Sequence, residues 1–249
     1  MRSHKLLSVC SKWQKWAMLM TVLLLPCSVF AVVNAEVTRV VIAGTDKGKA
    51  DALLRLANSD KEPTLVQLWL DEGDPAVAPD KVKTSVVIIP PVFKMAPGEI
   101  KSVRMMVPVW ETLAQDRETL YWLNIYQIPP QKAVHSDTTP RVILPLRIRM
   151  KVFLRPKGVA PLAEADGQKL RFQQSRTPKG RVMRVMNPTA WYMTINNIHC
   201  GNYTAETVMV APFSDLDIPL KGKTGTCQRV SYDILNDEGN IWSYTGATI

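Results

Sequence analysis

The chain has 249 residues, a formal net charge of +9 and a hydrophobic content of 46%. This length suits one large domain or two domains of immunoglobulin size. The basic residues are spread along the chain without a dense run, which argues against a nucleic-acid-binding protein. The sequence contains no G-x-S-x-G, P-loop, H-E-x-x-H or C-x-x-C motif. We therefore predict a protein that is not an enzyme and that has neither a cofactor nor a metal site.

The N-terminal region is typical of a secretory signal peptide. Four basic residues within 1–15 precede an uncharged run over 16–33, and Val33-Asn34-Ala35 offers compact residues at the −3 and −1 positions of a cleavage site. We expect removal of residues 1–35, which lowers the formal charge from +9 to +5 because four basic and no acidic residues are lost. A membrane anchor is the alternative, since 18 uncharged residues just reach spanning length. Proline and polar residues near the end of the run disfavour stable insertion.

The first half of the remaining chain predicts a series of short β-strands. Apolar residues alternate with polar ones in segments that are separated by proline, glycine and asparagine turns. About seven such strands in roughly 115 residues are typical of an all-β sandwich. They cover 37–43, 50–58, 64–73, 85–99 with a break at Pro90-Pro91, 100–109, 119–130 and 141–156.

The second half predicts another, smaller sandwich. Residues 154–167 contain proline and glycine without a clear period, as a linker does. Six short predicted strands follow, over 168–174, 180–188, 190–200, 207–220, 227–237 and 240–249. We therefore predict an N-terminal domain over 36–155 and a C-terminal domain over 156–249.

Two cysteines, Cys200 and Cys227, remain after removal of the signal peptide. An even pair in an exported protein predicts a disulfide bond. Zinc binding with the adjacent His199 is the alternative. Two cysteines and one histidine, however, lack the paired short spacings of a structural zinc site.

The segment over 141–156 has an unusual pattern for a strand. Val142, Leu144, Leu146 and Ile148 belong to one apolar row at period two, yet Pro145 lies within it. Proline cannot donate to a sheet ladder and is tolerated mainly on edge strands. A long apolar edge strand invites pairing with another chain. The pattern therefore indicates a surface that pairs with a partner.

Several segments in this order resemble the periplasmic chaperones of the chaperone–usher pathway, which assemble pili. The resemblance implies an all-β protein with two immunoglobulin-like β-sandwich domains in a boomerang arrangement. It also implies a chaperone that binds, folds and caps pilin subunits by donor-strand complementation and delivers them to an outer-membrane usher. The matching segments are TRVV (38–41), VQLWLDEG (66–73), PPVFKMAPGE (90–99), QDRETLYWLNIYQIPP (115–130), IRMKVFLRP (148–156), NPTAWYMTI (187–195) and ILNDEGN (234–240).

The resemblance also assigns roles to single residues. Val142, Leu144 and Leu146 match the side chains that such a chaperone donates to its client, and Ile148 is nearer to the junction with the core. Arg39 and Lys151 match the pair that holds the pilin's C-terminal carboxylate, which is chemically sensible because both donate charge-assisted hydrogen bonds.

Three further positions, Arg104, Glu118 and Asp237, match an ionic triad between the two domains of the family. The segment 131–140 is short, as in the short-loop branch of the family. Self-association of the unliganded protein through its apolar row stays open.

A secreted two-domain pilin or adhesin subunit is the alternative function. Such a subunit would carry its alternating donor segment at the mature N-terminus, whereas here that segment lies inside the chain at 141–156. A secreted sandwich enzyme or carbohydrate-binding protein is a third possibility, which the lack of a recognisable site disfavours.

Overall fold

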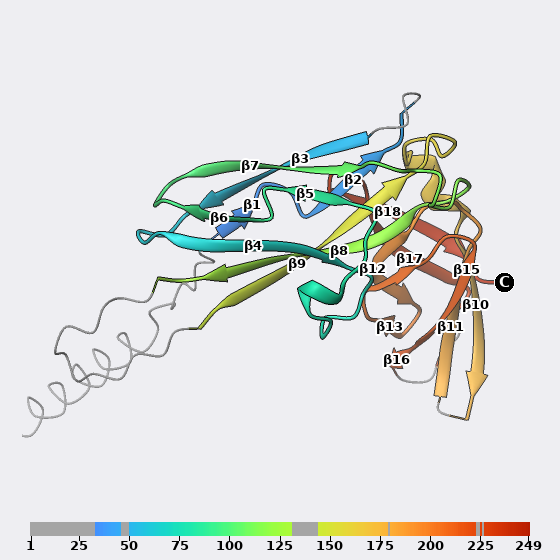
Figure 1. Ribbon diagram of the computed structural model, residues 1–249. Coiled ribbons are helices and arrows are strands. Elements are labelled where there is room, and N and C mark those ends of the chain that lie inside the picture. The colour runs from blue at the N-terminus through green and yellow to red at the C-terminus, as the bar shows by residue number, and fades with distance from the viewer. Residues whose placement is uncertain (1–32, 46–49, 131–143, 179, 223–224, 226) are drawn as a thin grey trace, which may run out of the picture. The chain divides into compact units, whose positions relative to one another are not determined.

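A computed structural model describes residues 33–45, 50–130, 144–178, 180–222, 225 and 227–249 (Figure 1). Over these residues the protein consists of β-strands and two short 3₁₀ helices, η1 (Pro79–Lys81) and η2 (Glu164–Lys169), so the predicted all-β class is confirmed. In the described part of the chain, no helix has both the length and the apolar character needed to cross a membrane.

The N-terminal sandwich consists of two sheets that face each other across a hydrophobic core. One sheet has the strand order β1-β3-β7-β5, and the other has the order β2-β9-β8-β4-β6. The strands are β1 (Val33–Ala35), β2 (Arg39–Ala43), β3 (Ala50–Asn58), β4 (Thr64–Asp71), β5 (Val87–Ile89), β6 (Val92–Met95), β7 (Ile100–Val107), β8 (Thr119–Ile128) and β9 (Leu146–Arg155).

The period of two in the sequence decides which face of each strand enters this core. In β7, Val103, Met105 and Val107 are buried, whereas Ser102 and Arg104 point to solvent. Successive side chains of a strand point to opposite faces, so one alternating row covers the core and the other remains wet.

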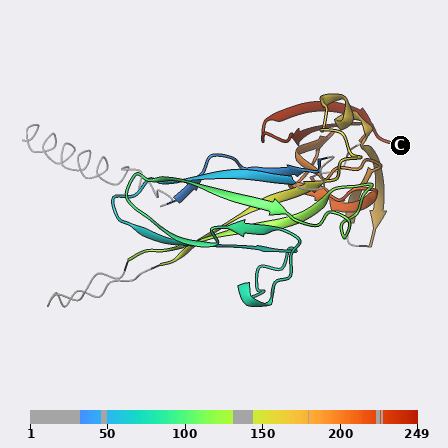
Figure 2. The ribbon, with the colours of Figure 1, turned by 45° about the horizontal axis from the view of Figure 1, so that its top comes forward.

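Strand β9 is paired unevenly along its length. On one side it runs antiparallel to β8 over nearly its whole length (Figure 2). On the other side the parallel strand β2 pairs only with Lys151–Arg155, with Arg39 opposite Lys151. Among the described strands, residues 146–150 therefore have an unpaired edge on the β2 side. Pro145 lies just before the strand, where its missing N–H costs no ladder bond.

The C-terminal sandwich has its own core and contains the predicted disulfide. A three-stranded sheet, β10-β11-β15, packs on a larger sheet with the order β16-β13-β12-β17-β18, in which β14 also pairs with β12. The strands are β10 (Arg171–Thr177), β11 (Gly180–Asn187), β12 (Met193–Cys200), β13 (Tyr203–Ala205), β14 (Val208–Val210), β15 (Ser214–Pro219), β16 (Lys221–Gly222), β17 (Arg229–Leu235) and β18 (Ile241–Ala247).

Cys200 and Cys227 form a disulfide bond with a Cα–Cα distance of 5.0 Å, which confirms the predicted pairing. Both cysteines are buried, whereas the side chain of His199 is exposed on the other face of β12. The bridge occupies both sulfur atoms, which favours the disulfide over the alternative zinc site.

Candidate functional site

Arg39 and Lys151 lie next to each other because the parallel ladder between β2 and β9 places them in register. Arg39 is 8% exposed, and its Nη1 donates to the backbone carbonyl of Leu235 at 3.1 Å. Its guanidinium group lies over the ring of Phe153, 5.7 Å from the centroid. The Nε of Arg39 is buried and has no hydrogen-bond partner among the described residues. The Arg39 side chain is thus held in place, and its Nε can still donate a hydrogen bond.

The ammonium group of Lys151 is held by polar and aromatic neighbours rather than by an acid. Its Nζ donates to the hydroxyl of Thr194 at 3.1 Å and lies 5.7 Å from the ring centroid of Trp122. Burial, together with the charge of Arg39, lowers the pKa of Lys151 to about 8. Burial also lowers the pKa of Arg39, against the opposing effect of Asp237 and Glu118. Two partly desolvated cations therefore lie next to each other, and this arrangement favours the binding of an anion.

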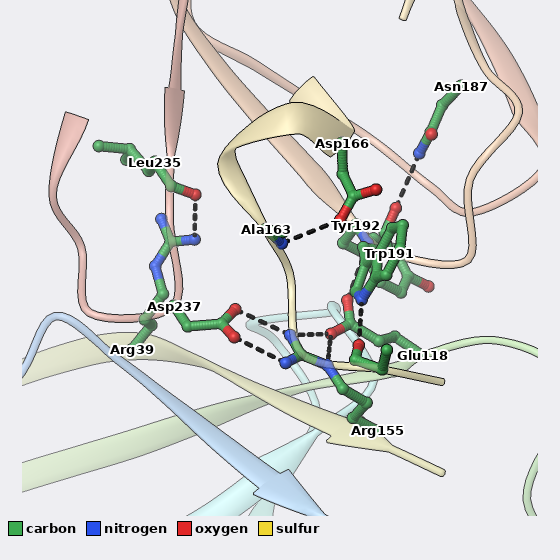
Figure 3. Close-up of polar contacts among 11 residues, drawn as sticks. Arg39, Glu118, Arg155, Ala163, Asp166, Asn187, Trp191, Tyr192, Leu235 and Asp237 are labelled. Atoms are coloured by element: carbon green, nitrogen blue, oxygen red, sulfur yellow. Dashed lines mark hydrogen bonds and ion pairs between the residues drawn. The ribbon is translucent and has the colours of Figure 1, made fainter. Parts of the chain in front are cut away.

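An ionic cluster forms around Arg155, the last residue of β9. Its Nε and Nη2 donate to Glu118 Oε1 at 2.9 and 2.7 Å (Figure 3). Its Nη1 and Nη2 donate to the two carboxylate oxygens of Asp237 at 2.6 and 2.8 Å. Burial acts to lower the pKa of Arg155, but the two carboxylates outweigh it and raise that pKa. All three guanidinium nitrogens of Arg155 therefore donate to a carboxylate.

Of the three residues that the resemblance placed in an ionic triad, Glu118 and Asp237 meet at Arg155, whereas Arg104 lies outside this cluster. Arg104 points to solvent from β7 and pairs with Asp51, 2.8 Å away, and both side chains are about half exposed. The outward face of β7 keeps Arg104 away from the cluster, whereas Arg155 stands where the chain leaves the N-terminal sandwich. The signal for Arg155 was its position directly before Pro156 at the end of the matching segment 148–156.

Glu118 also binds the backbone of the C-terminal sandwich. Its Oε2 accepts the N–H of Tyr192 at 2.8 Å, and its own N–H donates to the carbonyl of Ala190 at 2.9 Å. Burial raises the pKa of Glu118, while Arg155 and the Tyr192 amide act in the opposite direction. The carboxylate and the backbone amide of Glu118 therefore connect the start of β8 to the segment before β12.

The turn between β17 and β18 approaches the two arginines of the site. Asp237 in this turn binds Arg155, and Leu235 just before it binds Arg39 (Figure 3). Gly239 has a φ of +85°, and a Cβ there would lie 2.4 Å from the hydroxyl oxygen of Thr38. Glycine is needed for both the backbone conformation and the close approach.

The described part of the predicted donor row is exposed. Leu144 is 77% and Leu146 is 42% exposed, so neither is sealed in the core of its own domain. Ile148 is partly buried and packs against that core, which places it at the junction between the exposed row and the sandwich. Val142 lies outside the described residues.

Arg147 and Arg149 of β9 are bound within the N-terminal sandwich, which the sequence pattern did not indicate. Arg149 donates to the buried carboxylate of Asp71 at 2.5 Å, and Asn124 donates to the same carboxylate at 2.6 Å. Arg147 donates to the carbonyl of Pro75 at 2.9 Å. Arg39 and Lys151, which lie opposite each other in the ladder, take part in no ion pair among the described residues.

Comparison with known proteins places this two-sandwich fold in a defined class. Residues 32–160 match the pili and flagellar-assembly chaperone, PapD N-terminal domain, and residues 167–246 match the pili assembly chaperone PapD, C-terminal domain. The chain therefore belongs to the pilus-assembly chaperone family, whose members are chaperones and not enzymes. This finding also argues against the alternative of a structural pilin subunit.

Individual relatives agree with this assignment. The chaperone protein FimB/FhaD of Bordetella pertussis is 32% identical over 218 residues, which are 83% of this chain and 87% of that protein. The crystal structure of the YadV chaperone has a TM-score of 0.71 and 26% identity, and the match covers 87% of this chain and all of the other. The crystal structure of the CupB2 chaperone of Pseudomonas aeruginosa has a TM-score of 0.70 with the same identity and coverage. SafB of Salmonella enterica, solved in complex with the SafA pilin, shares the fold with a TM-score of 0.72 and 23% identity over 88% and 97% of the two chains.

Proposed function

We propose that this chaperone captures pilin subunits in the periplasm by lending them a β-strand, and that it then delivers them to an outer-membrane usher. The observation that carries the proposal is the exposure of Leu144 and Leu146 beside the unpaired edge of β9. A client that lacks a strand of its own could add its edge here, with main-chain hydrogen bonds supplying affinity and alternate side chains entering its groove.

Arg39 and Lys151 supply the second element of the proposed site, an anchor for the client's C-terminal carboxylate. Two cations in register, without an acidic partner among the described residues, suit bidentate and charge-assisted hydrogen bonds to a carboxylate. A client whose chain ends at Lys151 and whose preceding residues line 144–150 must run parallel to β9. Strand geometry puts Leu144 about 23 Å from Lys151 along the strand. The anchor would thereby set which client residues meet the leucines.

The hydrophobic contribution is large enough to matter. Burial of a leucine side chain is worth roughly 1.5–3 kcal/mol, so Leu144 and Leu146 together would contribute about 3–6 kcal/mol. The ordering of both chains on association offsets part of this gain. The carboxylate anchor would supply register and additional affinity.

We further propose that the chain belongs to the short-loop branch and is exported by a cleaved signal. Only ten residues, 131–140, separate YQIPP (126–130) from RVILP (141–145), and no cysteine lies between positions 36 and 199. The segment 131–140 lies outside the described residues. The exposed leucines also support self-association of the unliganded chaperone as an open prediction.

The test is co-expression with a pilin from the same organism and purification of the complex. Wild-type protein should give a soluble one-to-one complex. Leu144→Glu should lose the complex because it introduces a charge into the client's apolar groove, and the chaperone itself should remain folded. Leu53→Glu is the matched control, since Leu53 is 69% exposed on β3 in the other sheet. Retained capture by Leu144→Glu, or equal loss in both variants, would contradict strand donation.

A further inference from the structure

Two tripeptides near the N-terminus satisfy the same cleavage rule. Val29-Phe30-Ala31 and Val33-Asn34-Ala35 each place valine at −3 and alanine at −1 of a possible cut. The sequence pattern does not distinguish between them. The structure does, because residues 33–35 form strand β1 of the N-terminal sandwich.

Strand β1 is part of the folded domain. It pairs antiparallel with β3, with Val33 opposite Asn58 and Ala35 opposite Leu56. Val33 is fully buried in the hydrophobic core. The pairing continues past β1, where the N–H of Glu36 donates to the carbonyl of Arg55 at 3.2 Å. A cut after Ala35 would remove this edge strand and leave a hole in the core.

The side chain of Gln127 binds the backbone of β1 and so makes this strand a necessary part of the domain. Gln127 lies on β8, in the opposite sheet, and is 1% exposed. Its Oε1 accepts the N–H of Val33, and its Nε2 donates to the carbonyl of Val33, both at 2.9 Å. These two bonds satisfy a buried amide and tie one sheet to the other. Without Val33 both polar atoms of that amide would lose their partners inside the domain, which is costly.

The nitrogen of Val33 also limits where the chain can begin. It donates as a neutral peptide amide at a position with no solvent exposure. If Val33 were the first residue, this nitrogen would be an ammonium group, and burying an unpaired charge there would be strongly unfavourable. The folded protein therefore requires an intact peptide bond between Val32 and Val33.

We propose that the signal is removed between Ala31 and Val32, upstream of the cut that the second tripeptide predicts. The reaction is hydrolysis of that peptide bond: one water is consumed, Ala31 becomes the carboxyl end of the signal, and Val32 carries the new amino terminus. Strand β1 then remains in the mature protein.

The direct test is the intact mass and N-terminal peptide of the protein purified from the periplasm. We expect a chain that begins Val32-Val33-Asn34. A chain that begins at Glu36, or one that retains residue 1, would overturn the proposal. A matched pair of variants sharpens the test. Ala31→Val should slow or displace processing, whereas Ala35→Val should leave the cut in place and change the mass only by the substitution. The reverse pattern would contradict the proposal.

A second test measures whether β1 supports the fold. A foreign signal peptide can be fused directly before Val32 or before Glu36, and the two exported products compared by thermal unfolding. The shorter product should melt roughly 5–10 °C lower. Gln127→Met should lower the melting temperature of the longer product and have little further effect on the shorter one, because the amide's partner is already absent there. Equal melting temperatures would contradict the structural argument.

Discussion

Arg155 and Lys151 lie four residues apart on β9, yet their surroundings are opposite. Arg155 meets two carboxylates, from Glu118 and Asp237, and its charge is neutralised locally. Lys151 meets a hydroxyl, an aromatic ring and a second cation, Arg39. A buried charge that is paired with opposite charges helps to hold the structure together. A desolvated cation without an acidic partner can instead bind an anion from outside the protein. The difference separates a structural cluster from a candidate anion site.

The largest expected effect concerns the structural cluster. Arg155→Ala leaves two carboxylates without their shared partner and should destabilise the protein by about 3–5 kcal/mol. Arg104→Ala removes an exposed pair and should change stability by at most about 0.5 kcal/mol. Urea unfolding of both variants measures the contrast. Similar losses would mean that the Arg155 cluster is not the structural centre that its geometry indicates.

The second effect concerns capture rather than stability. Lys151→Ala and Arg39→Ala should each weaken client binding about 100-fold, because a buried carboxylate would lose a charge-assisted partner. The exposed residue Lys94 provides the control, and Lys94→Ala should bind normally. Binding of a client peptide with a free C-terminus, compared with its C-terminal amide, is the measurement. If wild-type protein does not prefer the free acid, the anchor is wrong.

The smallest effect is a pH dependence that differs in sign between binding and stability. With a pKa of about 8, Lys151 loses its charge above that pH, so capture should weaken about tenfold by pH 9. The unfolded chain keeps this lysine protonated to higher pH, since its ordinary value is 10.5. Between these values the unfolded state binds more protons, so the lysine's contribution to stability rises with pH.

Lys151→Arg should remove the pH dependence of capture, because arginine stays charged throughout this range. Titration of peptide affinity and of thermal unfolding from pH 7 to 10 tests both signs in one protein. A wild-type affinity that is flat over this range would show that Lys151 does not titrate in the site.

Part of this structure was predictable from local pattern. The predicted strand over 50–58 coincides with β3, because alternation and the turn residues after it are local signals. The disulfide followed from the cysteine count. The alternating pattern did not identify the arginine of the ionic cluster, since Arg104 and Arg155 both lie in apolar strands. Only the position of Arg155 at the end of the matching segment distinguished it in the sequence.

The sequence alone determined the all-β class, strands such as β3 and the apolar row before β9, since a period of two needs only neighbouring residues. It did not predict β1, whose residues 33–35 were assigned to the signal peptide. Tertiary structure decided which charges meet. The parallel register of β2 and β9 brings together Arg39 and Lys151, which are far apart in the chain, and the turn after β17 brings Asp237 to Arg155. Burial then assigns each group its role, because the same cation is paired in one surrounding and free to bind in the other.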